Sequence, residues 1–281
     1  MTDAAESQQT TGPPTAWDRV KLARETDRPT TQDYLADLFT DVVEYHGDRL
    51  FGDDRALIGG VASFRGRTVM VIGHQGGTNT RENISRNFGM PRPEGYRKAQ
   101  RLMRHAEKFG MPIITFIDTP GADPGISSEE RGQGTAIADS LMGMFDCCVP
   151  IICTVIAEGG SGGALAIGVG DRLLMLENAI YAVASPEACA TILWRDVAKA
   201  PEAAATMRIT AADCLRFGIV DEVIPEPTPA HEAPHEVIAA TGEHIARALD
   251  DVMNTFDLST GAGVEAMLEA RSEKFRRIGS W

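Results

Sequence analysis

The stretch TVIAEGGSGGALAIG at residues 154–168 decides how this sequence is interpreted. An unbroken apolar run, residues 149–157, is typical of a buried parallel strand, and it leads directly into a glycine-rich turn and a short helix of small residues. Glycines at the start of a helix leave main-chain N–H groups uncovered, and these groups favour negative charge. The pattern therefore predicts a main-chain oxyanion hole at Gly162 and Gly163. By spacing alone, the glycines also fit a turn that only lets the strand and the helix pack closely.

A second strand–loop–helix unit comes just before this one. Residues 112–117 form an apolar run, and DTPGADPG at 118–125 is rich in residues that break regular structure. Ligands bind at the carboxyl ends of neighbouring parallel strands, so both loops are expected at one site. The candidates for a second donor loop are Gly121 and Ala122. Substrate contacts are expected from Gly159, Gly160, Ser161, Asp123 and Glu187.

Two of these residues have alternative interpretations. Glu187 also fits a carboxylate in a first helical turn, where it complements the helix dipole. Ser161 lies in a formal G-x-S-x-G pattern, which can mark a hydrolase nucleophile. That role needs a histidine base, and the downstream histidines at 231, 235 and 244 lie in an acidic segment that contains prolines. A serine nucleophile is therefore not expected.

The remaining pattern predicts a disordered tail at 1–15 and a single domain at 16–281 with helical N- and C-terminal extensions. Strand-like runs lie at 56–64, 68–74, 172–176, 180–183 and 219–224. Helices are expected at 16–25, 31–45, 93–109, 164–168, 236–253 and 262–277, and from a capping box, Ser127 to Glu130, to residue 145. The segment 75–93 is expected to be a long polar loop.

Composition limits the classes of ligand. The 281 residues carry a formal net charge of -13, which opposes binding to nucleic acid or to anionic membranes. The five cysteines contain no CxxC pair, so we expect reduced thiols, no metal site and a cytoplasmic location. No signal peptide and no apolar run long enough to span a membrane is visible.

Several longer stretches carry a family resemblance: RPTTQDYLADLF (28–39), HGDRLFGDD (46–54), RNFGMPRPEGYRKAQRLMRHAEKF (86–109), PIITFIDTPGADPG (112–125), EERGQ (129–133), EGGSGGALAIGVGD (158–171) and SPEACATILW (185–194). With them the chain resembles the carboxyltransferase alpha subunits of bacterial, biotin-dependent acetyl-CoA carboxylases. The resemblance covers most of residues 16–278 in the family's order.

The resemblance implies an α/β fold of the crotonase-like (ClpP/crotonase) class, a spiral of ββα units. It implies transfer of a carboxyl group from carboxybiotin, borne by a separate biotin carboxyl carrier protein, to acetyl-CoA, which gives malonyl-CoA. Biotin carboxylase and a zinc-ribbon beta subunit are the implied partners, in an α2β2 assembly. In the family, the hole that matches Gly162 and Gly163 faces the biotin ureido oxygen, and the beta subunit's hole faces the thioester enolate. No side chain need act as base or nucleophile.

Some residues depart from the family pattern. Asp123 replaces a tyrosine, Ala157 and Ala188 replace glycines, and HQGG at 74–77 lacks a common lysine. These departures leave the acyl substrate open.

Two alternative functions also stay open: a crotonase-like hydratase, isomerase or decarboxylase that acts alone, and a scaffold subunit that supports an active beta partner. A basic run on the 93–109 helix is either a solvated face or a contact for phosphate or a partner: Arg97, Lys98, Arg101 and Arg104.

Overall fold

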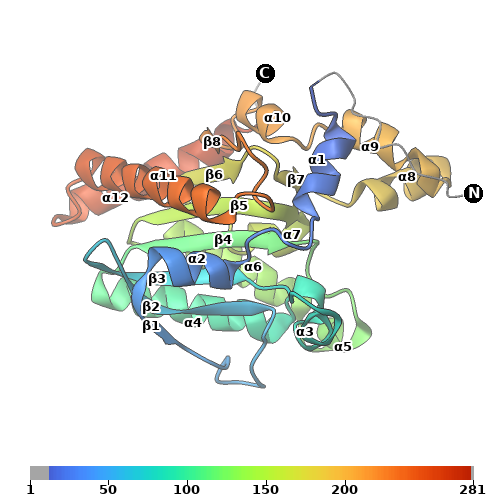
Figure 1. The fold of residues 1–281 in the computed structure, drawn as a ribbon. Helices are drawn as coiled ribbons and strands as arrows, with labels where there is room; N and C mark the ends of the chain where they lie inside the picture. The colour runs from blue at the N-terminus through green and yellow to red at the C-terminus, as the bar shows by residue number, and fades with distance from the viewer. Residues whose placement is uncertain (1–12, 280–281) are drawn as a thin grey trace, which may run out of the picture.

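The computed structural model describes residues 13–279, and its centre is one eight-stranded mixed sheet (Figure 1). The strand order is β1-β2-β3-β4-β5-β6-β8, and β7 pairs with the end of β5. The first three strands are antiparallel, and the pairings from β3 to β8 are parallel. The strands are β1 (Thr40–Glu44), β2 (Leu57–Phe64), β3 (Arg67–His74), β4 (Ile113–Thr119), β5 (Ile151–Gly160), β6 (Arg172–Leu176), β7 (Ile180–Ala182) and β8 (Glu222–Ile224).

Helices cover both faces of this sheet. The helices α2 and α11 lie on the near face in Figure 1, whereas α4, α6 and α12 lie behind it. The α-helices are α1 (Ala16–Ala23), α2 (Thr31–Leu38), α3 (Thr80–Ser85), α4 (Pro93–Phe109), α5 (Ile126–Glu130), α6 (Gln133–Asp146), α7 (Ser161–Leu165), α8 (Pro186–Trp194), α9 (Ala200–Met207), α10 (Ala211–Arg216), α11 (Pro234–Thr255) and α12 (Gly261–Arg277). Short 3-10 helices lie at Asn87–Gly89 and Val197–Lys199.

Turn and cap residues fix the elements that the sequence predicted best. The hairpin of β2 and β3 turns at Arg65 and Gly66, which both have positive φ, as a two-residue turn matched to strand twist requires. The helix α4 begins at Pro93 and ends before Gly110, whose φ of 64° closes the last turn. Both elements are confirmed. Of the expected tail, residues 1–12 lie outside the described residues, and Thr15 already caps α1.

The prediction of one helix over residues 31–45 was wrong at its second half. The helix α2 ends at Leu38, and residues 40–44 form β1 instead. The β-branched Val42 and Val43 favour an extended backbone, and pairing of Val43 with Val61 of β2 adds ladder hydrogen bonds. Edge pairing therefore overrides the helical spacing of the apolar residues.

Three other boundaries also differ from prediction. The helix expected from Ser127 to residue 145 is broken at Gly132, where a φ of 83° separates α5 from α6, and the predicted capping box does not form. The helix expected at 164–168 begins earlier, at Ser161, so Gly162 and Gly163 lie inside its first turn. The segment 75–93 contains α3 and a 3-10 turn.

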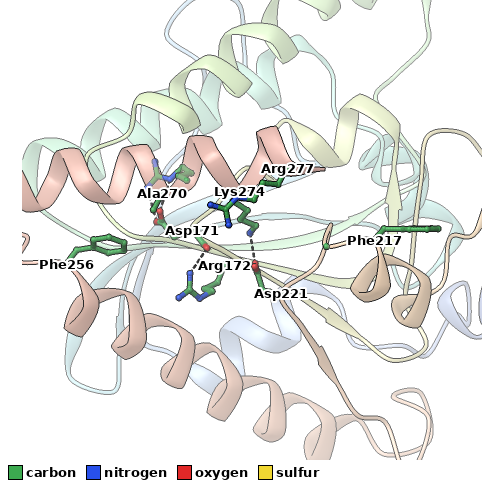
Figure 2. Close-up of a pocket in the computed structure, with 10 residues that line it drawn as sticks. Asp171, Arg172, Phe217, Asp221, Phe256, Ala270, Lys274 and Arg277 are labelled. Carbon is green, nitrogen blue, oxygen red and sulfur yellow. Dashed lines mark hydrogen bonds and ion pairs between the residues drawn. The ribbon is translucent and has the colours of Figure 1, made fainter. Parts of the chain in front are cut away.

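A buried arginine holds the C-terminal helix against the sheet. Arg271 of α12 is 1% exposed and pairs with both carboxylate oxygens of Asp171, at 2.9 and 2.8 Å. It also donates to main-chain carbonyls in the last turn of α6 and just after it, at Met144, Cys147 and Val149. A cleft of about 350 Å³ opens beside this pair, at the starts of β6 and β8 (Figure 2). Two cations that line the cleft, Arg172 and Lys274, pair with the carboxylates of Asp251 and Asp221. These ion pairs stabilise the packing of α11 and α12 against the sheet.

We expect Arg271→Ala to lower the free energy of unfolding by about 3–5 kcal/mol, because Asp171 would stay buried without its partner. Urea denaturation measures the change. The control is Arg277→Ala on the same helix, where an exposed pair with Glu273 contributes about 0.3–0.5 kcal/mol. Equal losses for the two variants would contradict the bracing role of Arg271.

Candidate active site

The two predicted loops meet at the carboxyl ends of β4 and β5. The strands run parallel, and Thr119 pairs with Gly159 where they end. A Cβ added to Gly160 would overlap with the Pro120 carbonyl, and one added to Gly163 would lie 2.5 Å from the Ala122 nitrogen. Only glycine allows this approach of two main chains. The structure therefore brings the loops together as the sequence predicted.

Three main-chain amides at this junction make no hydrogen bond within residues 13–279. They belong to Gly162 and Gly163, in the first turn of α7, and to Ala122 in the facing loop. Gly121 differs from this prediction, because its N–H donates to Thr119 Oγ1 at 3.1 Å and is not free. Unpaired N–H groups at the start of a helix are the donors that an oxyanion hole needs.

The other glycines of the turn serve packing. A Cβ on Gly159 would overlap with the Tyr181 ring. Ser161 is exposed and has a φ of 51°. Its hydroxyl bonds to no histidine in the described part of the chain, so the geometry of a serine nucleophile is missing there. The substrate contacts expected of Gly159, Gly160 and Ser161 stay predictions.

Asp123 and Glu187 are both engaged by neighbours. Ser128 Oγ donates to the Asp123 carboxylate at 2.5 Å, and the amide of Gly125 also donates to it. Burial opposes ionisation of Asp123, but these bonds keep its pKa below the ordinary value. Glu187 lies in the first turn of α8 and pairs with Arg24 at 2.6 Å. Arg24 also pairs with Glu158, at 2.9 Å, so it neutralises two carboxylates beside the site.

A buried, neutral histidine, which the sequence pattern does not single out, adjoins the turn. His74, at the end of β3, is fully buried, and burial lowers its pKa to about 3. Its Nδ1 accepts the Asp118 N–H at 3.4 Å, so Nε2 carries the proton. Nε2 has no hydrogen-bond partner among the described residues. The main-chain groups of Gly163 and Phe116 near the ring oppose part of the effect of burial on this pKa, so an uncharged ring lies between β4 and α7.

Two further polar groups at the junction have raised pKa values. The hydroxyl of Tyr96 is buried without a partner in the described chain, 2.9 Å from the point that a Cβ on Gly163 would occupy. Burial raises its pKa well above the ordinary value. Asp118, at the end of β4, has its pKa raised to about 6, first by burial and then by the nearby carboxylate of Glu158. Nothing in the sequence pattern distinguishes Tyr96 from a core residue, and Asp118 is marked there only as the first residue of the 118–125 loop.

Two clefts flank the junction. One of about 230 Å³ is polar and is lined by Arg24, Asp118 and Glu158, among others. The other, of about 250 Å³, is apolar and is lined by Ser161, Leu165 and their neighbours.

The part of the chain that the structure describes contains no group of three side chains placed to hold a metal ion. Nor does any helix between residues 13 and 279 have the length and apolarity of a membrane span.

We expect Asp118→Asn to stabilise the fold at about pH 8 and much less at about pH 4. An acid whose pKa is raised on folding makes the fold less stable as pH rises from its unfolded pKa through its folded pKa. A shift from 3.8 to about 6 corresponds to about 3 kcal/mol, and partial exposure of Asp118 reduces this to about 1–2 kcal/mol. Urea denaturation at both pH values measures the difference. If the stability difference between Asp118→Asn and the wild type is the same at both pH values, this account is contradicted.

Solved structures share this arrangement of strands and helices. A transcarboxylase 12S chain, with methylmalonyl-coenzyme A and methylmalonic acid bound, superposes with a TM-score of 0.66 at 22% identity over 82% of this chain. The match spans 44% of that chain's length. A Pseudomonas malonate decarboxylase hetero-tetramer in complex with coenzyme A gives a TM-score of 0.62 at 19% identity, over 81% of this chain and 91% of its own. The crotonase-like fold is thereby confirmed.

Sequence comparison identifies much closer relatives. Residues 3–279 match the family model described as acetyl co-enzyme A carboxylase carboxyltransferase-like. The acetyl-coenzyme A carboxylase carboxyl transferase subunits alpha of Bacillus thuringiensis (strain Al Hakam) and Bacillus cereus (strain AH187) are each 56% identical over 263 residues. These matches cover 94% of this chain and 79% of each relative. The chain therefore belongs to the family of acetyl-CoA carboxylase carboxyltransferase alpha subunits.

Proposed function

We propose that this chain binds carboxybiotin, borne by a separate carrier protein, and helps to transfer its carboxyl group to acetyl-CoA in fatty acid biosynthesis. The observation that carries the proposal is the set of unpaired amides at Gly162, Gly163 and Ala122. Family membership supplies the reaction class, and the amides supply a means of stabilising negative oxygen.

The proposed reaction exchanges one bond for another. The bond between the ureido nitrogen of biotin and the carboxyl carbon breaks, and its electron pair stays on the ureido group. That group takes a proton from the α-carbon of the acetyl thioester. A new bond then joins the α-carbon to the carboxyl carbon, which gives malonyl-CoA and biotin.

In this proposal, the amides act on the ureido oxygen as it gains negative charge. One such donor is typically worth about 2.7–4 kcal/mol of transition-state stabilisation. The neighbouring side chains support a main-chain mechanism. His74 is buried and neutral, and Glu187 is paired with Arg24, so neither is available as a base. Proton transfer within the substrates fits this arrangement.

Exposed apolar side chains support the proposed partnership with a beta subunit. A group on and around α7 and α8, which we call the α7–α8 patch, is open to solvent: Leu165, Val183, Ile192, Leu193 and Val197. Clustered exposed apolar residues mark interaction surfaces. The relatives are named as alpha subunits of a carboxyl transferase. We propose a zinc-ribbon beta subunit on this patch, an α2β2 assembly, association with biotin carboxylase, and a cytoplasmic location.

We expect the chain to form malonyl-CoA from acetyl-CoA and carboxybiotin only when the beta subunit is present. A coupled assay with each subunit alone and with both together measures this. Conversion of a CoA thioester by the isolated chain, without biotin, would instead indicate a hydratase-like enzyme. An active beta subunit that needs this chain only for its own stability would indicate a scaffold.

We expect Gly163→Ala to reduce carboxyl transfer by about 100-fold or more, because its Cβ forces the 121–122 main chain away and misplaces the donors. The matched control is Gly162→Ala. Its Cβ would meet only the Ile137 side chain, at an ordinary 3.5 Å, so transfer should stay within about threefold of wild type. Circular dichroism checks that both variants fold. Normal transfer by a folded Gly163→Ala variant would refute the assigned role.

A further inference from the structure

The loop between β1 and β2 presents two large apolar side chains to solvent. We call residues 47–52 the β1–β2 tip, which lies in the loop that extends below the sheet in Figure 1. In it Leu50 is 77% exposed and Phe51 is 69% exposed. Single exposed apolar residues are ordinary on protein surfaces, whereas two adjacent ones on a projecting loop indicate a contact surface.

The tip is rigidly built. The carboxylate of Asp48 accepts the amides of Leu50, Phe51 and Gly52 at 2.8–2.9 Å, and Arg97 donates to its other oxygen at 2.8 Å. Burial of Asp48 opposes its ionisation, but these bonds still lower its pKa to about 2. A loop that is ordered in advance loses little conformational entropy on binding. The exposed side chains are therefore held ready for a partner.

Basic side chains that lack ion pairs lie in and beside the tip, although the chain as a whole carries a net charge of -13. Arg49 and Arg101 donate only to main-chain carbonyls of His46 and Gly47. Neither they nor exposed Arg104 form an ion pair within residues 13–279. Burial and then the nearby Arg49 lower the pKa of Arg101, and the carboxylates of Asp53 and Asp48 offset only part of this effect. An incoming carboxylate would further favour the charged guanidinium.

Other basic residues of the same helix are already neutralised. Arg97 pairs with Asp48 and Glu94, and Lys98 pairs with Asp53. The basic run on α4 therefore separates into two sets: Arg97 with Lys98, and Arg101 with Arg104. Carboxylates neutralise the first set. Arg101 bonds only to main-chain carbonyls of the loop, and no ion pair within residues 13–279 neutralises Arg101 or Arg104.

The tip is joined to the candidate active site. The guanidinium of Arg131 lies 4.7 Å from the centre of the Phe51 ring, and its main-chain carbonyl accepts a hydrogen bond from Arg97. Arg131 ends the segment that begins with the Ala122 loop. The segment 122–131 therefore connects the tip with the loop that carries one of the candidate donors.

We propose that the β1–β2 tip is the docking point for the carrier protein that brings carboxybiotin, and that the carrier meets it with an acidic surface around a small apolar area. The inference rests on the proposed function. The tip suits a visiting partner because a small apolar centre ringed by charge favours fast, weak association. The α7–α8 patch has more exposed apolar side chains, which suits a permanent subunit instead.

The test uses the complex of this chain with its beta subunit. The test variant combines Leu50→Ser with Arg104→Glu, since neither side chain makes a hydrogen bond or ion pair among the described residues. We expect the KM for the carboxylated carrier to rise about tenfold with kcat unchanged. Transfer from malonyl-CoA to free biotin should keep its wild-type rate. Added salt should weaken the wild-type complex more than the variant.

The control also replaces one exposed apolar residue by serine and one cation by glutamate, as Phe109→Ser with Lys108→Glu at the far end of α4, and should leave the KM for the carrier unchanged. An unchanged KM in the tip variant, with normal free-biotin transfer, would overturn the docking inference alone. Loss of the beta subunit or a changed assembly by light scattering would also overturn it, because the tip would then be a subunit contact. A wild-type complex that transfers nothing to free biotin would refute the proposed function as well.

Discussion

The close approach of two main chains at the ends of β4 and β5 is the constraint on which the rest of the site depends. Gly160 lies against the Pro120 carbonyl, and Gly163 lies against the Ala122 amide, with no room for a Cβ at either glycine. Parallel pairing of the strands sets this distance, and the positions of the three unpaired amides follow from it. A loss of register between the strands would therefore separate the donors and disturb the core together, because both strands are buried.

The electrostatics of the junction explain why main-chain dipoles are suited to this site. The side chains beside it are kept neutral or compensated: His74 by burial, Tyr96 by burial, and Glu187 by Arg24. Asp118, whose pKa is raised to about 6, is the exception, because its carboxyl is mostly ionised at neutral pH. Fixed amides hold partial positive charge at the reacting oxygen and need no reorganisation as charge develops. A free cation there would bind the carboxylated and product forms strongly and thus discriminate less between ground and transition states.

Much of the fold could be predicted from the sequence where local chemistry decides the structure. Pro93 and Gly110 bound α4, and Arg65 with Gly66 sets the hairpin, because these residues control backbone angles directly. The strand β1 was missed because its pairing partner lies far along the chain. The glycine-rich turn was recognised, but His74 and Tyr96 were not selected as parts of the site. A histidine and a tyrosine in apolar surroundings show no spacing that separates them from ordinary core residues.

The departure from the family pattern at Asp123 can now be interpreted in structural terms. From the sequence, a carboxylate in place of a tyrosine adds negative charge near a site that must hold an anion. In the structure, Ser128 and the amide of Gly125 donate to that carboxylate, and Arg92 lies 3.7 Å from it. Its charge is thus largely compensated within its own loop. The residue orders the segment that carries Ala122, so the replacement is compatible with the main-chain donors and does not oppose them.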